Sequence, residues 1–259
     1  MGILNLTPDS FSDGGALASP DAALVRAVQM LAAGADWLDV GGESSRPGAE
    51  PIPEAEELHR VLPAIEAIRA AVSTPISIDT TKPAVARAAV AAGATMWNDV
   101  GALRAPGALE AAADLGCEVV LMHMQGAPAT MQDDPRYDDV VAEVTAFLQG
   151  RAEAAIRAGV TAERIWLDPG LGFGKTPAHN LALLRALGRI VDLGFPVVVG
   201  ASRKGWIRAL DPSARQASDR LGGSLALALA AARAGAAMVR VHDVRETVQA
   251  LTVDTAVHG

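Results

Sequence analysis

The sequence has few of the residues on which several common classes of protein depend. Of its 259 residues one is cysteine, five are histidine and only 3% are aromatic. The single Cys117 cannot form a disulfide within the chain, which fits the reducing cytoplasm, and we expect it to fill space in the core. So few histidines do not suggest the ligand set of a tight zinc site. With so few aromatic residues, Ala, Val, Leu and Ile must build the core.

The chain also lacks an excess of positive charge and a long uninterrupted apolar run. Its net charge of −8 disfavours nucleic acid or an anionic membrane as a partner. The most apolar stretch, 221–239, contains Arg233 and several glycines, so we expect a buried helix and not a membrane span. Polar Asn5 and Asp9 interrupt the first residues, which is not typical of a secretory signal peptide.

The sequence does contain eight short apolar runs, most of them followed by a segment of helical periodicity. This alternation predicts βαβ units and a parallel sheet. The length of 259 residues suits one TIM (β/α)₈ barrel, a single α/β domain over 1–259. An open doubly wound sheet is the alternative, but no Gly-x-Gly-x-x-Gly turn follows the first run. The expected strands are 2–6, 36–41, 75–79, 94–98, 117–123, 164–168, 196–201 and 237–242.

A polar residue stands at or just after the end of each apolar run. In a (β/α)₈ barrel the active site lies at the carboxyl ends of the strands, so we expect these side chains to meet in one cup. They are Asn5, Asp39, Asp79, Asn98, Asp99, His123, Asp168, Ser202, Lys204, Arg240 and His242.

Four residues near this cup are cationic or potentially so: Arg46, Lys204, Arg240 and His242. In an acidic protein such a group suggests a site for phosphate or pyrophosphate. Arg46 lies in the segment GESSRPG, where Ser45 and backbone N–H groups could share the anion. The alternative is that each cation pairs with a neighbouring acid.

Acids and an amide at the same place suggest a second ligand. Buried Asp79, Asp168 and Asn98 would be costly unless hydrogen-bonded, and a flat heterocycle with N–H donors would satisfy them. The acids could instead hold a metal. Mg²⁺ that arrives with a pyrophosphate needs few protein ligands, and Asn5 could supply one.

The segment DPGLGFGK at 168–175 contains a glycine-rich turn. It lacks the Walker A spacing of a phosphate loop. We expect its glycines to let the backbone approach a ligand, and Phe173 to form an apolar wall. His123 is expected in the core or in a position that supports the site.

Two connections after strands are long for such units, 7–20 and 41–53. Both are rich in Gly, Pro, Ser and Asp, which are typical of irregular connections. We expect both to act as lids on the catalytic side of the barrel.

Eight sequence motifs occur in order at the ends of the predicted strands. They are MGILNLTPDSFSDGG, DVGGESSRPGAE, ISIDTTKP, MWNDV, MHMQG, LDPGLGFGK, GASRK and RVHDV. Together they resemble the dihydropteroate synthase family over nearly the whole chain. The resemblance implies a TIM barrel and a transferase of folate synthesis, which joins 6-hydroxymethyl-7,8-dihydropterin pyrophosphate to p-aminobenzoate. The products would be 7,8-dihydropteroate and pyrophosphate.

The resemblance also implies which residues bind the pterin. Asp79, Asn98, Asp168 and Lys204 would hold the ring, with Arg240 stacking near it. Asp79, Asp168 and Lys204 would take part in catalysis.

Further roles follow from the same resemblance. Ser45, Arg46 and His242 would bind the pyrophosphate, with Arg46 and His242 also catalytic, and Asn5 would ligate Mg²⁺. The p-aminobenzoate would be framed by Lys204 together with Pro47, Phe173 and Ser202.

We therefore expect a cytoplasmic enzyme, a homodimer formed through the late helices, with small-molecule substrates and a dissociative substitution. The sequence has no Ser–His–Asp or Cys–His arrangement, and a neutral aromatic amine needs no strong general base. Two other functions remain open: a corrinoid-linked methyltransferase with a folate methyl donor, and a paralogue that binds dihydropterin without making product.

Overall fold

The computed structural model describes residues 1–7 and 19–258, and its strands alternate with helices along the chain. The strands follow the predicted runs closely for the first six and are shorter for the last two. They are β1 (Gly2–Asn5), β2 (Leu38–Gly41), β3 (Ile76–Asp79), β4 (Met96–Asp99), β5 (Glu118–Met122), β6 (Ile165–Asp168), β7 (Val198–Val199) and β8 (Met238–Val239).

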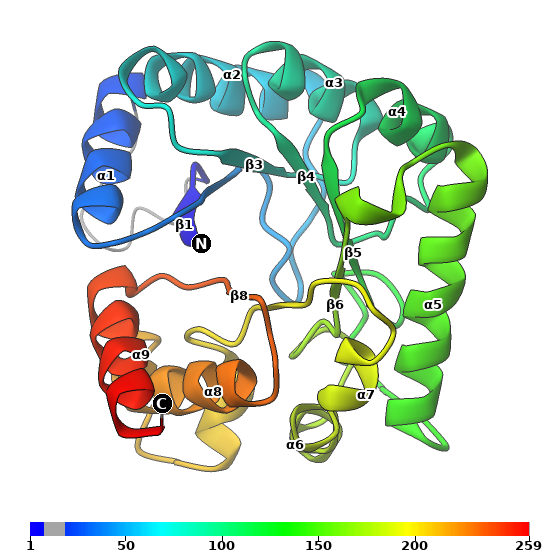
Figure 1. The fold of residues 1–259 in the computed structure, drawn as a ribbon, viewed down its shortest axis with the longest axis vertical. Helices are drawn as coiled ribbons and strands as arrows, with labels where there is room; N and C mark the ends of the chain where they lie inside the picture. The colour runs from blue at the N-terminus through cyan, green and yellow to red at the C-terminus, as the bar shows by residue number, and fades with distance from the viewer. Residues whose placement is uncertain (8–18, 259) are drawn as a thin grey trace.

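The strands form a closed parallel ring (Figure 1). Strands β1 to β6 pair in sequence order, and β7 pairs with β8. Single bridges join Leu167 to Val197 and Gly2 to Val241, which connects β6 to β7 and β8 to β1. The predicted TIM barrel is confirmed, and the open doubly wound sheet is wrong because the last strand returns to the first.

The helices surround this ring (Figure 1), and helices that are neighbours in sequence pack against each other along most of it. Small side chains face the strands, for example Ala23 and Ala27 of the first helix, so the helices approach closely. The helices are α1 (Pro20–Ala32), α2 (Glu54–Ala71), α3 (Pro83–Ala91), α4 (Ala108–Leu115), α5 (Val140–Ala158), α6 (Pro177–Arg185), α7 (Gly188–Val191), α8 (Leu221–Arg233) and α9 (Val244–His258).

Polar side chains fix where several helices begin. Asp139 accepts hydrogen bonds from the N–H groups of Val141 and Ala142, both at 3.0 Å, which caps α5. Thr176 and His179 form a reciprocal capping box at the start of α6. These caps end the preceding loops at defined residues, so the connections into α5 and α6 each have a fixed end point.

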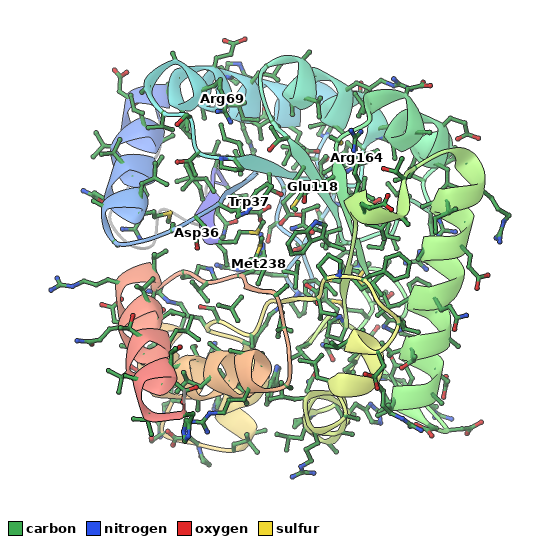
Figure 2. The ribbon with its side chains drawn as sticks, in the orientation of Figure 1. Asp36, Trp37, Arg69, Glu118, Arg164 and Met238 are labelled. Atoms are coloured by element: carbon green, nitrogen blue, oxygen red, sulfur yellow. The ribbon has the colours of Figure 1, made fainter. Side chains whose placement is uncertain are left out.

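Apolar side chains fill the barrel interior in one layer. Met1, Met96, Val120 and Val198 form a separate buried cluster, against which the partly buried Trp37, Trp166 and Met238 pack. Figure 2 shows Trp37 and Met238 near the barrel axis, with Asp36 close to Trp37. Trp37 directly precedes β2, and Met238 is the first residue of β8. The apolar layer therefore closes the amino-terminal end of the ring, and polar interior residues lie toward the carboxyl ends.

The last two strands are shorter than predicted, and past their carboxyl ends a serine side chain replaces one backbone acceptor. After Val199 the N–H of Arg240 still donates to the Val199 carbonyl at 3.0 Å. Beyond that point the N–H of His242 donates to Ser202 Oγ at 3.2 Å. Within the part of the chain that the structure describes, no helix is both long and apolar enough to cross a bilayer.

Candidate active site

Arg240, which follows β8, joins two acids that lie on β2 and β3. Its Nε lies 2.6 Å from Asp39 Oδ2, and one Nη lies 2.6 Å from Asp79 Oδ2. Asp39 is fully buried. The prediction that Arg240 and Asp79 meet at the strand ends is confirmed. The alternative that a cation pairs with neighbouring acids is also correct for Arg240.

These contacts change the proton affinity of both partners. Burial lowers the pKa of Arg240, but Asp39 and Asp79 outweigh it and raise that pKa well above its ordinary value. Burial raises the pKa of the Asp79 carboxyl to about 7, although the charge of Arg240 opposes the change. One guanidinium thus balances two carboxylates, and this side of the mouth favours a ligand that supplies N–H donors.

Asn98 extends the same polar row on β4. It is the register partner of Asp79 on the neighbouring strand, and its Nδ2 lies 3.4 Å from Asp39 Oδ1. The next residue, Asp99, faces away and accepts from the N–H groups of Gly101 and Leu103 at 2.6 and 2.7 Å. Asp99 therefore holds the turn after β4, and only Asn98 of the two contributes to the mouth.

Asp168, the last residue of β6, stands on the other side of Arg240. A Cβ added at Gly200 would lie 3.9 Å from both Arg240 Cβ and Asp168 Oδ2, so these two side chains flank one glycine. Asp168 Oδ1 accepts from the N–H of Gly170 at 2.7 Å. Burial raises the pKa of Asp168, while Lys204 and Arg240 act in the opposite direction.

Lys204 lies between this acid and an aromatic ring. Its Nζ is 4.1 Å from the centre of the Phe173 ring, a cation–π contact. Burial lowers the pKa of Lys204 to about 8, although Asp168 favours the charged form. The structure brings together the predicted Asp168, Lys204 and Phe173, and an apolar wall does stand beside a cation.

Ser202 and His242 form a second pair at the same end of the barrel. Ser202 Oγ lies 3.1 Å from His242 Nδ1 and also accepts from the His242 N–H. Burial, together with the charges of Arg240 and Arg203, lowers the pKa of His242 to about 3. The sequence left His242 as a potential cation, and this lowered pKa favours its neutral form, in which the ring is a hydrogen-bonding group.

The connection from β2 to α2 carries Ser45, Arg46 and Pro47. Ser45 is half-buried, whereas Arg46 and Pro47 are exposed. The charge of Arg46 is one of the smaller causes that lower the pKa of His242, so the two groups are near enough to interact electrostatically. The N–H of Gly48 donates to the carbonyl of Pro128 at 3.1 Å. Most of the other predicted lid, 8–18, lies outside the described residues.

Asn5 lies at the end of β1, in a row with Gly41 and Asp79 across three strands. A Cβ on Gly41 would lie 3.7 Å from Asn5 Oδ1 and 3.5 Å from Asp79 Cβ. The amide oxygen thus faces the mouth beside an acid, and such an oxygen is a suitable ligand for Mg²⁺. The described residues contain no cluster of three or more His, Cys, Asp or Glu that could hold a metal by itself. The donors fit a cation that arrives with its own anionic ligand.

Sequence comparison identifies the family of this barrel. The chain matches the model of the pterin binding enzymes over residues 1–242. It is 50% identical over 256 residues to the dihydropteroate synthase of Escherichia coli strain K12, a match that covers 98% of this chain and 89% of that protein. The chain belongs to the dihydropteroate synthase family. It is therefore a transferase of folate synthesis, and the corrinoid-linked methyltransferase is not supported.

Solved structures of the family have the same architecture. A Xanthomonas albilineans dihydropteroate synthase with 4-aminobenzoic acid is 53% identical, with a TM-score of 0.94, and the match covers all of this chain (100%) and 92% of that one. The enzyme from the same organism in complex with 7,8-dihydropteroate is 50% identical, with a TM-score of 0.90, and the match covers 100% of this chain and 93% of the other. The described residues of this chain therefore have the fold of these solved family members.

The glycine turn at 168–175 was expected to let the backbone approach a ligand. Two of its glycines instead let it approach the backbone that follows β5. A Cβ at Gly170 would lie 1.9 Å from the His123 carbonyl oxygen, and a Cβ at Gly174 would lie 2.5 Å from that of Gln125. Both glycines have positive φ, 65° and 58°. They let the turn approach the end of β5, so the close approach is to neighbouring backbone. At Gly172, by contrast, the nearest side chain is Lys204, with Cδ 3.2 Å from a built Cβ.

Sequence reasoning missed the partners of this turn. Lys175 is only 2% exposed, and its Nζ lies 2.9 Å from His123 Nδ1. Tyr137 donates to the Gly174 carbonyl at 2.7 Å. The one available signal was a lysine that follows three spaced glycines, a place where a buried ammonium can reach several carbonyls. His123 was expected in the core or in a supporting position, and the structure confirms this.

Proposed function

We propose that this mouth condenses 6-hydroxymethyl-7,8-dihydropterin pyrophosphate with p-aminobenzoate to give 7,8-dihydropteroate and pyrophosphate by dissociative substitution. One observation carries the assignment: Arg240 holds Asp39 and Asp79 together beside Asn98 and Asp168 at the open end of the barrel. A flat bicyclic ring with several N–H groups matches this row of buried acceptors.

The pterin would lie across the row of polar groups. Asp79, Asn98 and Asp168 would accept from its ring N–H and amino groups, and Lys204 would donate to a ring oxygen or nitrogen. Arg240 is held in place by two carboxylates and would stack against the ring face. Asp39 and Asp168 are buried and the Asp79 side chain is 11% exposed, so pairing with the ligand would compensate for their lost hydration.

Departure of the leaving group would involve the other side of the mouth. Both electrons of the C–O bond leave with the pyrophosphate oxygen, and positive charge develops on the pterin methylene. Arg46 and Ser45 would bind the departing anion with His242. Ser202 Oγ lies against His242 Nδ1. A hydroxyl proton directed to Nδ1 leaves the ring proton on Nε2, free to donate to the anion.

Mg²⁺ would enter with the pyrophosphate, and Asn5 Oδ1 would be its protein ligand. When bound, the ion neutralises charge that builds up on the leaving oxygens. Asp79 lies next to Asn5 across Gly41 and would help to stabilise the developing pterin cation, together with Asp168.

The p-aminobenzoate would lie between Phe173, Pro47, Ser202 and Lys204. The lone pair of its neutral amine forms the new C–N bond, after which the nitrogen loses one proton to water. No strong base is required, since an aromatic amine is already unprotonated near pH 7. Exclusion of water matters more, because water would trap the cation as the alcohol. The 41–53 connection, tied to Pro128 by Gly48, would provide part of the cover.

A pyrophosphate-release assay tests this function and separates it from simple pterin binding. The protein with Mg²⁺ and the pterin pyrophosphate should release pyrophosphate and form dihydropteroate when p-aminobenzoate is added. A protein that binds the pterin tightly but forms no product with any concentration of p-aminobenzoate would be the non-catalytic paralogue.

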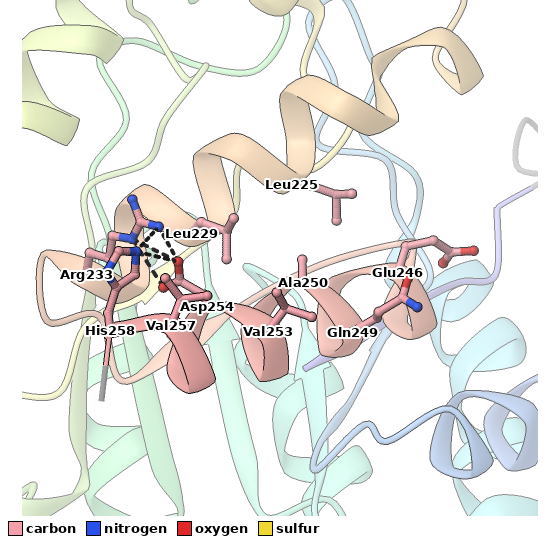
Figure 3. A pocket seen from close by; sticks show the side chains of 10 residues that line it. All are labelled: Leu225, Leu229, Arg233, Glu246, Gln249, Ala250, Val253, Asp254, Val257 and His258. Atoms are coloured by element: carbon pink, nitrogen blue, oxygen red, sulfur yellow. Dashed lines mark hydrogen bonds and ion pairs between the residues drawn. The ribbon is translucent and has the colours of Figure 1, made fainter.

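We also propose that the protein is a cytoplasmic homodimer, joined through α8 and α9. The single cysteine supports the reducing compartment. A groove of about 420 Å³ lies between the two helices, and Figure 3 shows its apolar side chains, including Leu225, Leu229 and Val253, beside Arg233 with Asp254. Val257 on this surface is 67% exposed, a large exposed fraction for an apolar side chain on a helix.

The oligomeric state can be tested with a matched pair of substitutions. Sedimentation of Val257→Asp should show a monomer, whereas Val28→Asp should remain a dimer, since Val28 is a 47% exposed valine on α1 and outside the groove. A wild-type protein that sediments as a monomer at micromolar concentration, or equal behaviour of the two variants, would contradict the dimer.

A further inference from the structure

Lys175 is a buried lysine whose contacts are all with neutral groups. Its Nζ donates to the carbonyl oxygens of Phe173 at 2.9 Å, Gly170 at 3.0 Å and His123 at 3.2 Å, and lies 2.9 Å from His123 Nδ1. The side chain is 2% exposed. Burying an ammonium group without a carboxylate partner is costly, so a lysine at this buried position requires a compensating role.

Three carbonyl oxygens converge on this one group. Those of Gly170 and Phe173 belong to the turn after β6, and that of His123 belongs to the residue directly after β5. Carbonyl dipoles that point at one place repel each other unless a donor stands between them. The turn is also pressed against β5, as the 1.9 Å approach of a Gly170 Cβ to His123 O shows. Lys175 therefore supplies the donor that this folded-back turn requires.

The other parts of the turn have their own partners. Asp168 belongs to β6, and its carbonyl accepts from the His123 N–H at 3.0 Å. The Gly172 N–H donates to Asn180 Oδ1, and the Gly174 carbonyl accepts from Tyr137, both at 2.7 Å. For the Phe173 carbonyl, Lys175 is the hydrogen-bond donor within the described residues.

The position of Phe173 matters because its ring meets Lys204. The Nζ of Lys204 lies 4.1 Å from the ring centre, and under the proposed function both residues border the p-aminobenzoate. A shift of the Phe173 backbone would move this wall while Asp168, held in its strand, stays in place. Substitution of Lys175 should thus change KM for p-aminobenzoate more than KM for the pterin pyrophosphate.

We infer that Lys175 is a positioning residue for the arylamine: it holds the Phe173 backbone so that the ring stands against Lys204 as the wall of the p-aminobenzoate pocket. Burial lowers the pKa of Lys175 to about 7, with Lys204 also lowering it and Asp168 opposing. Burial of this ammonium is unfavourable, which agrees with a lysine whose role is to hold the backbone of the turn in place. The inference rests on the proposed placement of p-aminobenzoate beside Phe173.

A double-mutant cycle with Lys175→Met and Phe173→Ala tests the inference, with KM measured for each substrate. Methionine has a similar length but neither charge nor donor. Each single variant should raise KM for p-aminobenzoate by about tenfold and change KM for the pterin pyrophosphate by less than about threefold. Because Lys175 acts through Phe173, the double variant should resemble the larger single effect and not their product.

Tyr137→Phe is the matched control. It removes a different hydrogen bond from the same turn and should leave KM for p-aminobenzoate within about twofold of the wild type. Lys175→Gln, which keeps a neutral donor, should give an intermediate KM and replaces the methionine variant if that protein does not fold. Thermal unfolding and direct binding of the pterin pyrophosphate check the fold of each preparation.

The outcomes separate this inference from the proposed function. If Phe173→Ala leaves KM for p-aminobenzoate unchanged, the proposed pocket is wrong. If Phe173→Ala raises it but Lys175→Met does not, or if the two effects multiply in the double variant, Lys175 does not position Phe173. A Lys175→Met protein that loses kcat with both KM values unchanged would also overturn the inference.

Discussion

Arg240 and Asp79 lie 2.6 Å apart across the barrel mouth, although 160 residues separate them in sequence. The same guanidinium contacts Asp39, so one cation organises the acids of two neighbouring strands. This arrangement prepares the mouth for a ligand rich in N–H donors before the ligand arrives. Loss of the central cation would leave two carboxylates facing each other in a buried site.

Arg240→Met is therefore expected to lower the free energy of unfolding by about 3–5 kcal/mol, the usual cost of leaving a buried ion pair without one partner. Chemical denaturation measures this change. Adding Asp39→Asn to Arg240→Met should recover part of the loss, because one of the two unpaired charges is removed. If the single variant is as stable as the wild type, Arg240 does not organise these acids.

The pKa of Lys204 predicts a pH dependence of activity. Burial lowers this pKa to about 8, so the ammonium is present below that value and is lost as the pH rises through it. If the charged form binds the pterin, kcat/KM for the pterin pyrophosphate should fall above about pH 8. The groups that face Lys204, namely Asp168, Arg240 and Asp79, set this value together.

Lys204→Arg should move the fall in kcat/KM to a higher pH, since arginine keeps its charge throughout the accessible range. The overall rate can be lower, because the guanidinium has a different shape. An alkaline limb that stays at the same pH in the arginine variant would assign the titration to another group.

Gly170 and Gly48 offer a test of the close approach between the glycine turn and β5. Both have positive φ, 65° and 79°, but a Cβ at Gly48 meets nothing within 4 Å, whereas at Gly170 it meets His123 O at 1.9 Å. Gly48→Ala should cost about 1–2 kcal/mol of stability from backbone strain alone. Gly170→Ala should cost about 3 kcal/mol or more, since overpacking adds to the strain. Equal costs in thermal or chemical unfolding would show that the turn is not pressed against β5.

Arg46→Ala should reduce kcat by a factor on the order of 10², because Arg46 would stabilise the charge of the departing pyrophosphate. Arg185→Ala, at another exposed arginine, on α6, serves as the control and should retain full turnover. Steady-state kinetics with saturating substrates compares the two. Near-normal kcat in Arg46→Ala would remove this residue from the leaving-group site.

Much of this site could be predicted because a parallel barrel brings all strand ends to one place. Asp79, Asn98 and Asp168 are each within the last two residues of a strand, so the pattern of apolar runs was enough to bring them together. The way the chain leaves β7 and β8 could not be predicted, since there the N–H of His242 donates to Ser202 Oγ and not to a backbone carbonyl.

Charge states were harder to predict than positions. His242 lies at the predicted strand end, but burial and the charges of Arg240 and Arg203 lower its pKa, an effect that depends on three-dimensional neighbours. The role of Lys175 was missed for the same reason. Its partners include His123, which is 52 residues away in sequence, and local spacing does not reveal that contact.

The most direct test of the account is a crystal of this protein soaked with the pterin pyrophosphate and Mg²⁺ in the absence of p-aminobenzoate. We predict the pterin ring against Asp79, Asn98 and Asp168, and a pyrophosphate separated from it beside Arg46 and His242. A ring bound outside this mouth would contradict the account, as would a pyrophosphate still bonded to the pterin in a crystal that forms product once p-aminobenzoate is added.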